Sequence, residues 1–264
     1  DVYKRQSTTC TFSNNIVSNN TATGGTGGGI SIAEFGGNNT VVFAHNTISS
    51  NTAPGGGGGM YVYFGSTVCT LLGNTISNNS APAGAGGGVF IQSCGPLTAS
   101  IQNNNVFGNL AIEGGGLFLR RNCQILTQFA LTGNAIANNQ ARGTGSGDGS
   151  GGGLYILNTS GGSGLVVNLA SNTITGNVAD GGPTGGNGLG GGLYVTEHLT
   201  SYFTTVNLAG NQSTGLFNVL SGNTADFGDA IYNNMLYNKN GGNDIQAGFV
   251  CWGGLDPNPT VSPN

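Results

Sequence analysis

Apolar and polar positions alternate with a period of two in short segments along the chain, and these segments belong to a unit that recurs seven times. One phrase reads N-x-Φ-x-x-N-x-A, where Φ is aliphatic, and its copies begin at Asn15, Asn46, Asn74, Asn104, Asn134, Asn172 and Asn218. A glycine triplet followed by Φ-x-Φ lies between the copies, and a Φ-x-Φ-x-x-N phrase leads into them. Period-two alternation bounded by Gly and Asn predicts strands, and no segment has the 3.6-residue spacing of a helix. Each unit is therefore expected to hold three short strands.

The spacing of the copies indicates how these strands are arranged. Subtracting successive start positions gives 31, 28, 30, 30, 38 and 46 residues, and periods of this size are typical of solenoids. A propeller also repeats at this period, but its blades are antiparallel and usually have four strands. Parallel crossover connections are nearly always right-handed. The sequence thus predicts an all-β, right-handed parallel β-helix solenoid of about seven coils, with three short strands per coil.

Stacking of the coils places equivalent residues in columns. Two aliphatic columns should point inward and form the core: Ile30, Met60, Val89, Leu117, Leu154, Leu193 and Ile32, Val62, Ile91, Leu119, Ile156, Val195. Two asparagine columns should form amide ladders at the corners, as stacked asparagines do in cross-β arrays: Asn46, Asn51, Asn74, Asn79, Asn104, Asn109, Asn134, Asn139, Asn172 and Asn177. The glycine triplets are expected at a tight corner of each coil, because glycine adopts positive φ there without steric cost.

The residue between the two inward aliphatics is aromatic in six of seven coils and should point outward. These six residues are the candidate ligand-binding residues: Tyr61, Phe90, Phe118, Tyr155, Tyr194 and Tyr232. An exposed aromatic stripe can stack on sugar rings, and an exposed apolar patch usually marks an interaction site. This interpretation predicts that Tyr155→Ala and Tyr194→Ala abolish binding and retain the fold. Alternatively, the rings stabilise the sheet by stacking on one another, beneath the long Gly-rich turns of the fifth and sixth units.

The composition narrows the choice of partners. Charged residues make up 6% of the chain and the net charge is −4, which gives no attraction to nucleic acid. No apolar run is long enough to cross a membrane. Most of the 52 glycines fall in register with the repeat or in two long turns, and these turns, residues 142–150 and 180–190, are predicted to be the flexible segments.

The cysteines fall into two groups. Cys10 and Cys69 share an inward column and are expected to be buried as small apolar residues. Cys94 and Cys123 follow their glycine triplets at nearly equal offsets in adjacent coils, so a disulfide between them is possible and would favour an exported protein. No C-x-x-C motif or His/Cys cluster indicates a metal site. No metal or other cofactor is expected.

The chain is expected to have three parts. Residues 1–6, DVYKRQ, differ sharply in composition from the rest and read like a translated sequencing adapter, so we exclude them and expect a fragment of a longer protein. Residues 7–234 are the β-helix. Residues 235–264 are predicted to be a cap, with Phe249 and Trp252 over the last coil, followed by a Pro-rich linker.

The pairing of F-x-x-N with G-G-x-Φ resembles the repeats of polymorphic outer membrane proteins and related surface β-helices. It occurs at residues 12–15 before the triplet at Gly27, at 43–46 before Gly57, and as G-D-A-I-Y at 228–232. Later units depart from the pattern, with Leu or Ile in place of Phe and GGG in place of the family's frequent GGA. The resemblance implies a pectin-lyase-like fold and an adhesin-like or autotransporter-passenger-like protein, extracellular or on a bacterial cell surface.

Two function classes remain open. The first is a non-enzymatic stalk or adhesive surface, with a polysaccharide or a host or cell-surface glycan as partner. The second is a carbohydrate-active enzyme, a polysaccharide lyase or glycoside hydrolase, which predicts two carboxylates, or a carboxylate and Arg121, within about 10 Å in a groove.

The acidic residues are dispersed along the chain. Glu34, Arg121 and Glu197 share a column offset, but each gap is expected to span three coils. Asp226 and Asp229 are the one close carboxylate pair, and turn capping explains them better than catalysis.

A third class, ice binding, needs a regular threonine grid. Asn105 and Ala135 interrupt the column of Thr47, Thr75 and Thr173.

Overall fold

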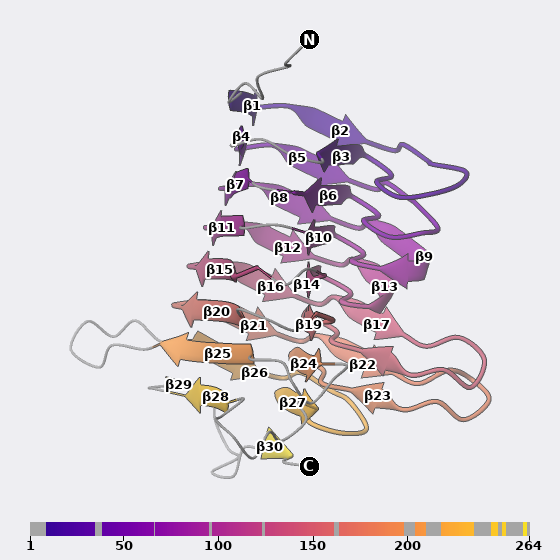
Figure 1. The fold of residues 1–264 in the computed structure, drawn as a ribbon. Helices are drawn as coiled ribbons and strands as arrows, with labels where there is room; N and C mark the ends of the chain where they lie inside the picture. Colours follow the sequence, from indigo (N-terminus) through magenta and orange to yellow (C-terminus); the bar gives the residue numbers. More distant parts are fainter. Residues whose placement is uncertain are drawn as a thin grey trace.

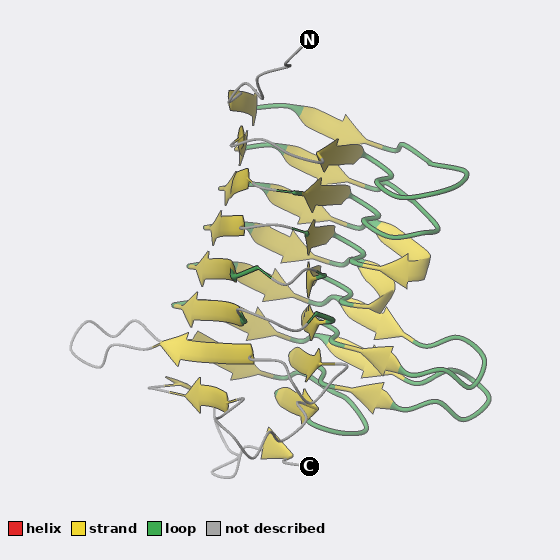
Figure 2. Ribbon diagram, viewed as in Figure 1, coloured by secondary structure: helices red, strands yellow, loops and turns green. Residues whose placement is uncertain are grey.

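The structure, a computed structural model, describes residues 9–34, 39–65, 67–94, 97–122, 125–160, 164–197, 204–209, 218–234, 244–247, 250–251 and 261–262. These residues contain strands and loops and no helix (Figure 2).

The strands form three eight-stranded parallel sheets that stack along one axis (Figure 1). The first sheet has the order β1 (Thr9–Ser13), β4 (Asn39–Ala44), β7 (Thr67–Leu72), β11 (Leu97–Gln102), β15 (Thr127–Thr132), β20 (Leu165–Ala170), β25 (Thr204–Ala209), β28 (Asp244–Ala247). The second has the order β3 (Ile30–Glu34), β6 (Met60–Phe64), β10 (Val89–Ser93), β14 (Leu117–Arg121), β19 (Leu154–Asn158), β24 (Leu193–Glu197), β27 (Ile231–Asn234), β30 (Val261–Ser262). The third has the order β2 (Ile16–Ser18), β5 (Thr47–Ser49), β8 (Thr75–Ser77), β12 (Asn105–Phe107), β16 (Ala135–Ala137), β21 (Thr173–Thr175), β26 (Asn218–Ser221), β29 (Val250–Cys251).

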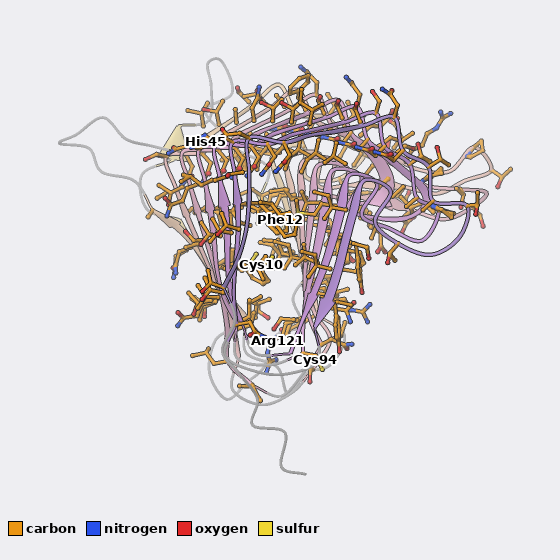
Figure 3. The ribbon with its side chains drawn as sticks, turned by 90° about the horizontal axis from the view of Figure 1, so that it is seen from above. Cys10, Phe12, His45, Cys94 and Arg121 are labelled. Carbon is orange, nitrogen blue, oxygen red and sulfur yellow. The ribbon has the colours of Figure 1, made fainter. Side chains whose placement is uncertain are left out.

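Each coil of the chain contributes one strand to each sheet, so the molecule is a parallel β-helix with the three strands per coil that the sequence predicts. The strand register matches the columns, for example Val89 with Leu117 and Leu117 with Leu154. The inward aliphatics join one continuous core that runs from Val41 to Ile231. Seen along the axis, the coils superpose in a roughly triangular section, with Phe12 and Cys10 inside it (Figure 3).

The stack extends beyond the predicted boundary at residue 234. β28, β29 and β30 pair in parallel with β25, β26 and β27, so each adds an eighth strand to its sheet. These strands lie within the segment predicted to be a cap and linker, residues 235–264, and that division of the chain stays a prediction. Phe249 and Trp252 lie outside the described residues.

Both asparagine columns form ladders. At Asn139, the side-chain Oδ1 accepts bonds from the backbone N–H and Nδ2 of Asn109, at 3.1 and 2.9 Å. Its Nδ2 donates to Asn177 Oδ1 at 2.9 Å and to the Val106 carbonyl at 3.0 Å. The same pattern runs from Asn15 to Asn218 in one ladder and from Asn20 to Asn223 in the other.

The corners of the coils have left-handed backbone, as the sequence predicts for the glycine triplets. The first glycine of each triplet has φ between 60° and 73°. The described residues that directly precede the ladder asparagines are also left-handed, and here non-glycine residues are frequent, for example His45 at 57° and Ser50 at 56°.

A fourth sheet lies outside the triangular section, formed by the turns between the asparagine phrase and the glycine triplet. It has the order β22 (Val178–Asp180), β17 (Gln140–Arg142), β13 (Leu110–Glu113), β18 (Gly149–Ser150), β23 (Gly188–Leu189), and β9 (Ser80–Ala85) also pairs with β13. We call these strands and their connecting turns the arm; it projects to one side in Figures 1 and 3.

The two long Gly-rich turns, which the sequence predicts to be flexible, are parts of the arm and are hydrogen-bonded to each other. Gly182 N–H donates to the Gly147 carbonyl at 2.9 Å, and Thr184 N–H donates to the Gly145 carbonyl at 3.0 Å. A Cβ added at Gly143 or Gly186 would lie 2.0 Å from the Gly147 carbonyl oxygen. The glycines thus allow two backbones to pack directly on each other, which ties the turns together.

Candidate functional site

The aromatic column points away from the main core, as predicted, but it is not an exposed stripe. Phe90, Phe118, Tyr155 and Tyr194 are 7%, 2%, 5% and 5% exposed. Tyr61 and Tyr232 at the two ends are half-buried. The prediction of an open sugar-stacking surface is therefore wrong for the four central rings.

The arm is the physical reason for this burial. The four rings form a second apolar cluster with Ala85 on β9 and Leu157 on β19, and Leu189 on β23 packs against it. Consecutive rings from Tyr61 to Tyr194 meet edge to face with centroids 4.7–5.2 Å apart, a preferred geometry for aromatic pairs. The four central rings therefore agree with the alternative interpretation, in which the rings stack on one another beneath the turns.

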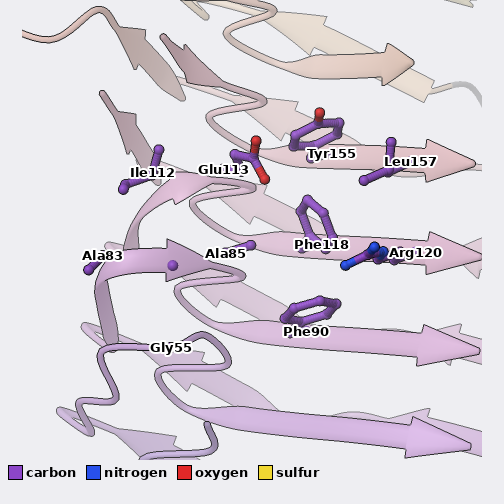
Figure 4. A pocket seen from close by; sticks show the side chains of 11 residues that line it. Gly55, Ala83, Ala85, Phe90, Ile112, Glu113, Phe118, Arg120, Tyr155 and Leu157 are labelled. Atoms are coloured by element: carbon purple, nitrogen blue, oxygen red, sulfur yellow. The ribbon is translucent and has the colours of Figure 1, made fainter. Parts of the chain in front are cut away.

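A cavity of about 460 Å³ remains between the arm and the aromatic column (Figure 4). We call it the arm pocket. Its lining comes from Gly55, from β9 and β13 of the arm, and from β10, β14 and β19 of the second sheet: Gly55, Ala83, Gly84, Ala85, Phe90, Ile112, Glu113, Phe118, Arg120, Tyr155 and Leu157.

The unequal lengths of the turns explain where the pocket lies. The turn between Asn109 and Gly114 is shorter than the one before it, from Asn79 to Gly86, and far shorter than the one after it, from Asn139 to Gly151. The fourth unit thus covers less of the second sheet than its neighbours do. Its own residues Ile112, Glu113 and Arg120 line the resulting space.

Arg120 and Arg121 are adjacent on β14 and point in opposite directions. Arg121 is fully buried inside the coil, whereas Arg120 is half-buried and lines the arm pocket. Arg120 Nε is shielded from solvent and has no hydrogen-bond partner among the residues that the structure describes. A buried N–H group without an acceptor is costly, so this atom is a candidate for a ligand contact.

Glu113 supplies the pocket's carboxylate. It ends β13 directly before the glycine triplet and pairs in register with Ala85 and Ser150. Burial raises the pKa of Glu113 above its ordinary value, and the positive charge of Arg120 offsets only part of that rise. In Figure 4 the carboxylate lies near the Tyr155 ring. Burial, with the negative charge of Glu113, also raises the pKa of Tyr155, so its hydroxyl stays protonated.

Sequence reasoning missed that Arg120 and Glu113 line the same pocket. Strand alternation alone indicates that Arg120, two residues after Phe118, faces outward. That Glu113 lines the same pocket depends on the path of the arm.

Arg121, which the sequence offered as a partner for a catalytic carboxylate, belongs to a buried polar chain inside the coil. Its guanidinium donates to Asn158 Oδ1 at 3.0 Å, and to the carbonyls of Ile125 and Ser160. Asn158 Nδ2 donates to Thr204 Oγ1 at 2.9 Å, and the Thr204 hydroxyl donates to Glu197 at 3.3 Å.

The register places Arg121 and Glu197 two strands apart, through Asn158, which corrects the expected three coils. The interior position of the chain indicates a structural role.

The remaining acidic residues of the arm bond to nearby backbone or side-chain donors. Asp229 accepts the backbone N–H of Ala225 at 2.8 Å, which agrees with a turn-capping role, and Asp226 accepts that of Gly188 at 2.6 Å. Asp148 accepts the N–H of Asn187, and Asp180 accepts a bond from Gln140. Across the described ranges, no three His, Cys, Asp or Glu side chains gather as a metal site would require.

The cysteines follow the predicted columns with one exception. Cys69 is buried, and burial raises its pKa to about 12, whereas Cys10 on the end strand β1 is exposed. Cys94 is disulfide-bonded. Cys123 lies outside the described residues, so its pairing with Cys94 stays a prediction.

In the part of the chain that the structure describes, no helix has the length and apolar character to span a membrane.

Three stacked parallel sheets, an inward aliphatic core and two asparagine ladders define a β-helix repeat protein. The sequence model of the family described as "Right handed beta helix region" matches residues 2–208, so the chain belongs to the right-handed β-helix family. No curated protein and no solved structure shows significant similarity to the chain.

Proposed function

We propose that this chain is a non-enzymatic, exported or surface-displayed β-helix, adhesin-like or stalk-like, that binds glycans through the arm pocket. The observation that carries the proposal is Arg120 Nε, a shielded donor to which the described part of the chain supplies no acceptor, in a pocket lined by aromatic rings and a carboxylate. Ligand sites are typically concave and mostly apolar, with a few polar groups that orient the ligand. The disulfide at Cys94 supports export, because disulfides persist in oxidising compartments.

The long core and the asparagine ladders support the stalk-like part of the proposal. Each coil contacts its neighbours through parallel pairing in all three sheets, and the ladders add buried hydrogen bonds at two corners. Such a solenoid holds a lateral pocket at a set height along a rod.

The proposal is tested by incubating the purified chain with immobilised plant, microbial and animal-type glycans and scoring bound protein and released sugar separately. We expect binding without released product, and weaker binding by Arg120→Gln. Arg142→Gln is the matched control, since Arg142 lies on the arm and lines a different cavity. Equal binding by the wild type and Arg120→Gln would contradict the assignment of the pocket.

A second candidate function is a carbohydrate-active enzyme, and one observation favours it. Glu113 has a raised pKa in a pocket that also holds an arginine, and a raised pKa is typical of a general acid. Hydrolysis normally needs a second carboxylate across the cleft, whereas Glu113 is the one acidic residue among those that line the pocket. Released oligosaccharide that is lost in Glu113→Gln would establish this function in place of the first.

A further inference from the structure

The charges of the arm pocket restrict which sugars it can take. One carboxylate, Glu113, and one guanidinium, Arg120, line it, and its other lining residues are uncharged. An anionic sugar would bring its charge beside the carboxylate of Glu113, and an amino sugar with a free ammonium would bring its charge beside Arg120. In a partly desolvated pocket such like-charge contacts are strongly unfavourable.

The hydrogen-bonding capacities of the two side chains point to hydroxyl groups. An ionised carboxylate only accepts hydrogen bonds and a guanidinium only donates them. A hydroxyl can do both, so two hydroxyls of one sugar ring can donate to Glu113 and accept from Arg120. The ligand would then supply the acceptor that Arg120 Nε lacks.

The apolar part of the lining matches the rest of a sugar ring. Phe90, Phe118, Ile112 and Leu157 present carbon atoms to the cavity, against which the C–H groups of a pyranose can pack. The volume of about 460 Å³ lies within the range of roughly 300 to 1,000 Å³ that small-molecule sites occupy.

We infer that the arm pocket binds an uncharged pyranose unit, with one hydroxyl donating to Glu113 and another accepting from Arg120. This inference rests on the proposed glycan-binding function and adds the class of sugar. Glu113 lies where burial disfavours its charge, and a destabilised ionisable group in a pocket is typical of a functional site.

The test is a calorimetric titration of the full chain with five oligosaccharides. Cellohexaose, mannohexaose, xylohexaose and acetylated chitohexaose are the neutral probes, and hexagalacturonate is the anionic probe. We expect at least one neutral probe to bind, and hexagalacturonate to bind at least tenfold more weakly. Glu113→Gln and Arg120→Gln should each weaken neutral binding at least tenfold. Arg142→Gln should leave it unchanged within twofold.

Thermal unfolding of each variant separates loss of the fold from loss of the site, and Glu113→Gln preserves the shape of the side chain. Preference for hexagalacturonate would overturn the inference but leave glycan binding in place. The same conclusion would follow if a neutral probe bound and neither Glu113→Gln nor Arg120→Gln weakened that binding. Binding of none of the five probes would overturn the proposed function and the inference together.

Discussion

The third glycine of a triplet, Gly153, packs directly against an asparagine of the next coil's ladder, Asn177. A Cβ added at Gly153 would lie 2.9 Å from Asn177 Nδ2 and 2.7 Å from the Gly192 carbonyl oxygen. The equivalent glycines Gly59, Gly88 and Gly116 face Asn79, Asn109 and Asn139 in the same way. The glycine phrase and the asparagine phrase are therefore two halves of one packing contact.

Gly153→Ala should destabilise the protein, because the methyl group meets the backbone of Gly192 as well as the Asn177 side chain. Overpacking of this kind costs about 1–3 kcal/mol in free energy of unfolding. Urea unfolding of the variant measures the loss. Gly24→Ala is the control, since a Cβ at Gly24 has no atom within 4 Å, and it should change stability by less than about 0.5 kcal/mol. Equal losses in both variants would contradict the packing argument.

Asn139→Ala should interrupt one ladder. It removes the acceptor of Asn109 N–H and Nδ2 and a donor to Asn177 Oδ1, all in a buried corner. Each buried group left unsatisfied costs about 1–3 kcal/mol, so we expect a loss of roughly 3–5 kcal/mol in denaturant unfolding. Asn105→Ala, on the exposed face of β12, should have little effect. A similarly small loss for Asn139→Ala would show that the ladder does not stabilise the fold.

Phe118→Ala should destabilise the fold, in contrast to the sequence-based expectation that Tyr155→Ala and Tyr194→Ala in the same column retain it. Phe118 is 2% exposed and contacts the Phe90 and Tyr155 rings at centroid distances of 4.7 Å. Truncating a buried Phe typically costs about 3–5 kcal/mol. Phe107→Ala on β12, where the ring is half-buried, is the matched control and should cost clearly less in the same unfolding assay.

Glu113 should make the stability of the wild type fall as pH rises, and Glu113→Gln, which carries a neutral side chain of the same shape, should lack this dependence. Because burial raises the pKa of Glu113 above 4.5, the folded state binds the proton more tightly than the unfolded state does. This contribution to stability is present below pH 4.5 and is lost as pH rises through the raised pKa. Glu113→Gln should therefore be more stable than the wild type at neutral pH, and the two should converge near pH 4.

Urea unfolding of both proteins from pH 4 to 8 measures that difference. Arg142→Gln, which leaves Glu113 in place, should run parallel to the wild type. A Glu113→Gln variant less stable than the wild type at pH 7 would show that the ionised carboxylate is stabilised in the pocket.

The repeat phrases allow the coil to be predicted because their information is local and periodic. Alternation at Val89, Phe90 and Ile91 indicates which side chain points inward, and parallel stacking carries that assignment from coil to coil. The ladders follow for the same reason, since Asn109, Asn139 and Asn177 occupy equal positions in successive units. The end of the array was harder to predict, because β28, β29 and β30 pair with the stack without carrying the phrases.

The sequence by itself determined the coil, its core and the outward direction of the aromatic column. Only the tertiary structure decided that the Gly-rich turns pair as a fourth sheet, bury Phe118 and Tyr155, and bring Glu113 to the pocket that Arg120 lines. The reason is physical. The side of a strand on which a side chain lies follows from alternation within a few residues. The path of a turn depends instead on backbone contacts between coils whose turns differ in length, such as the contacts that Gly143 and Gly182 make.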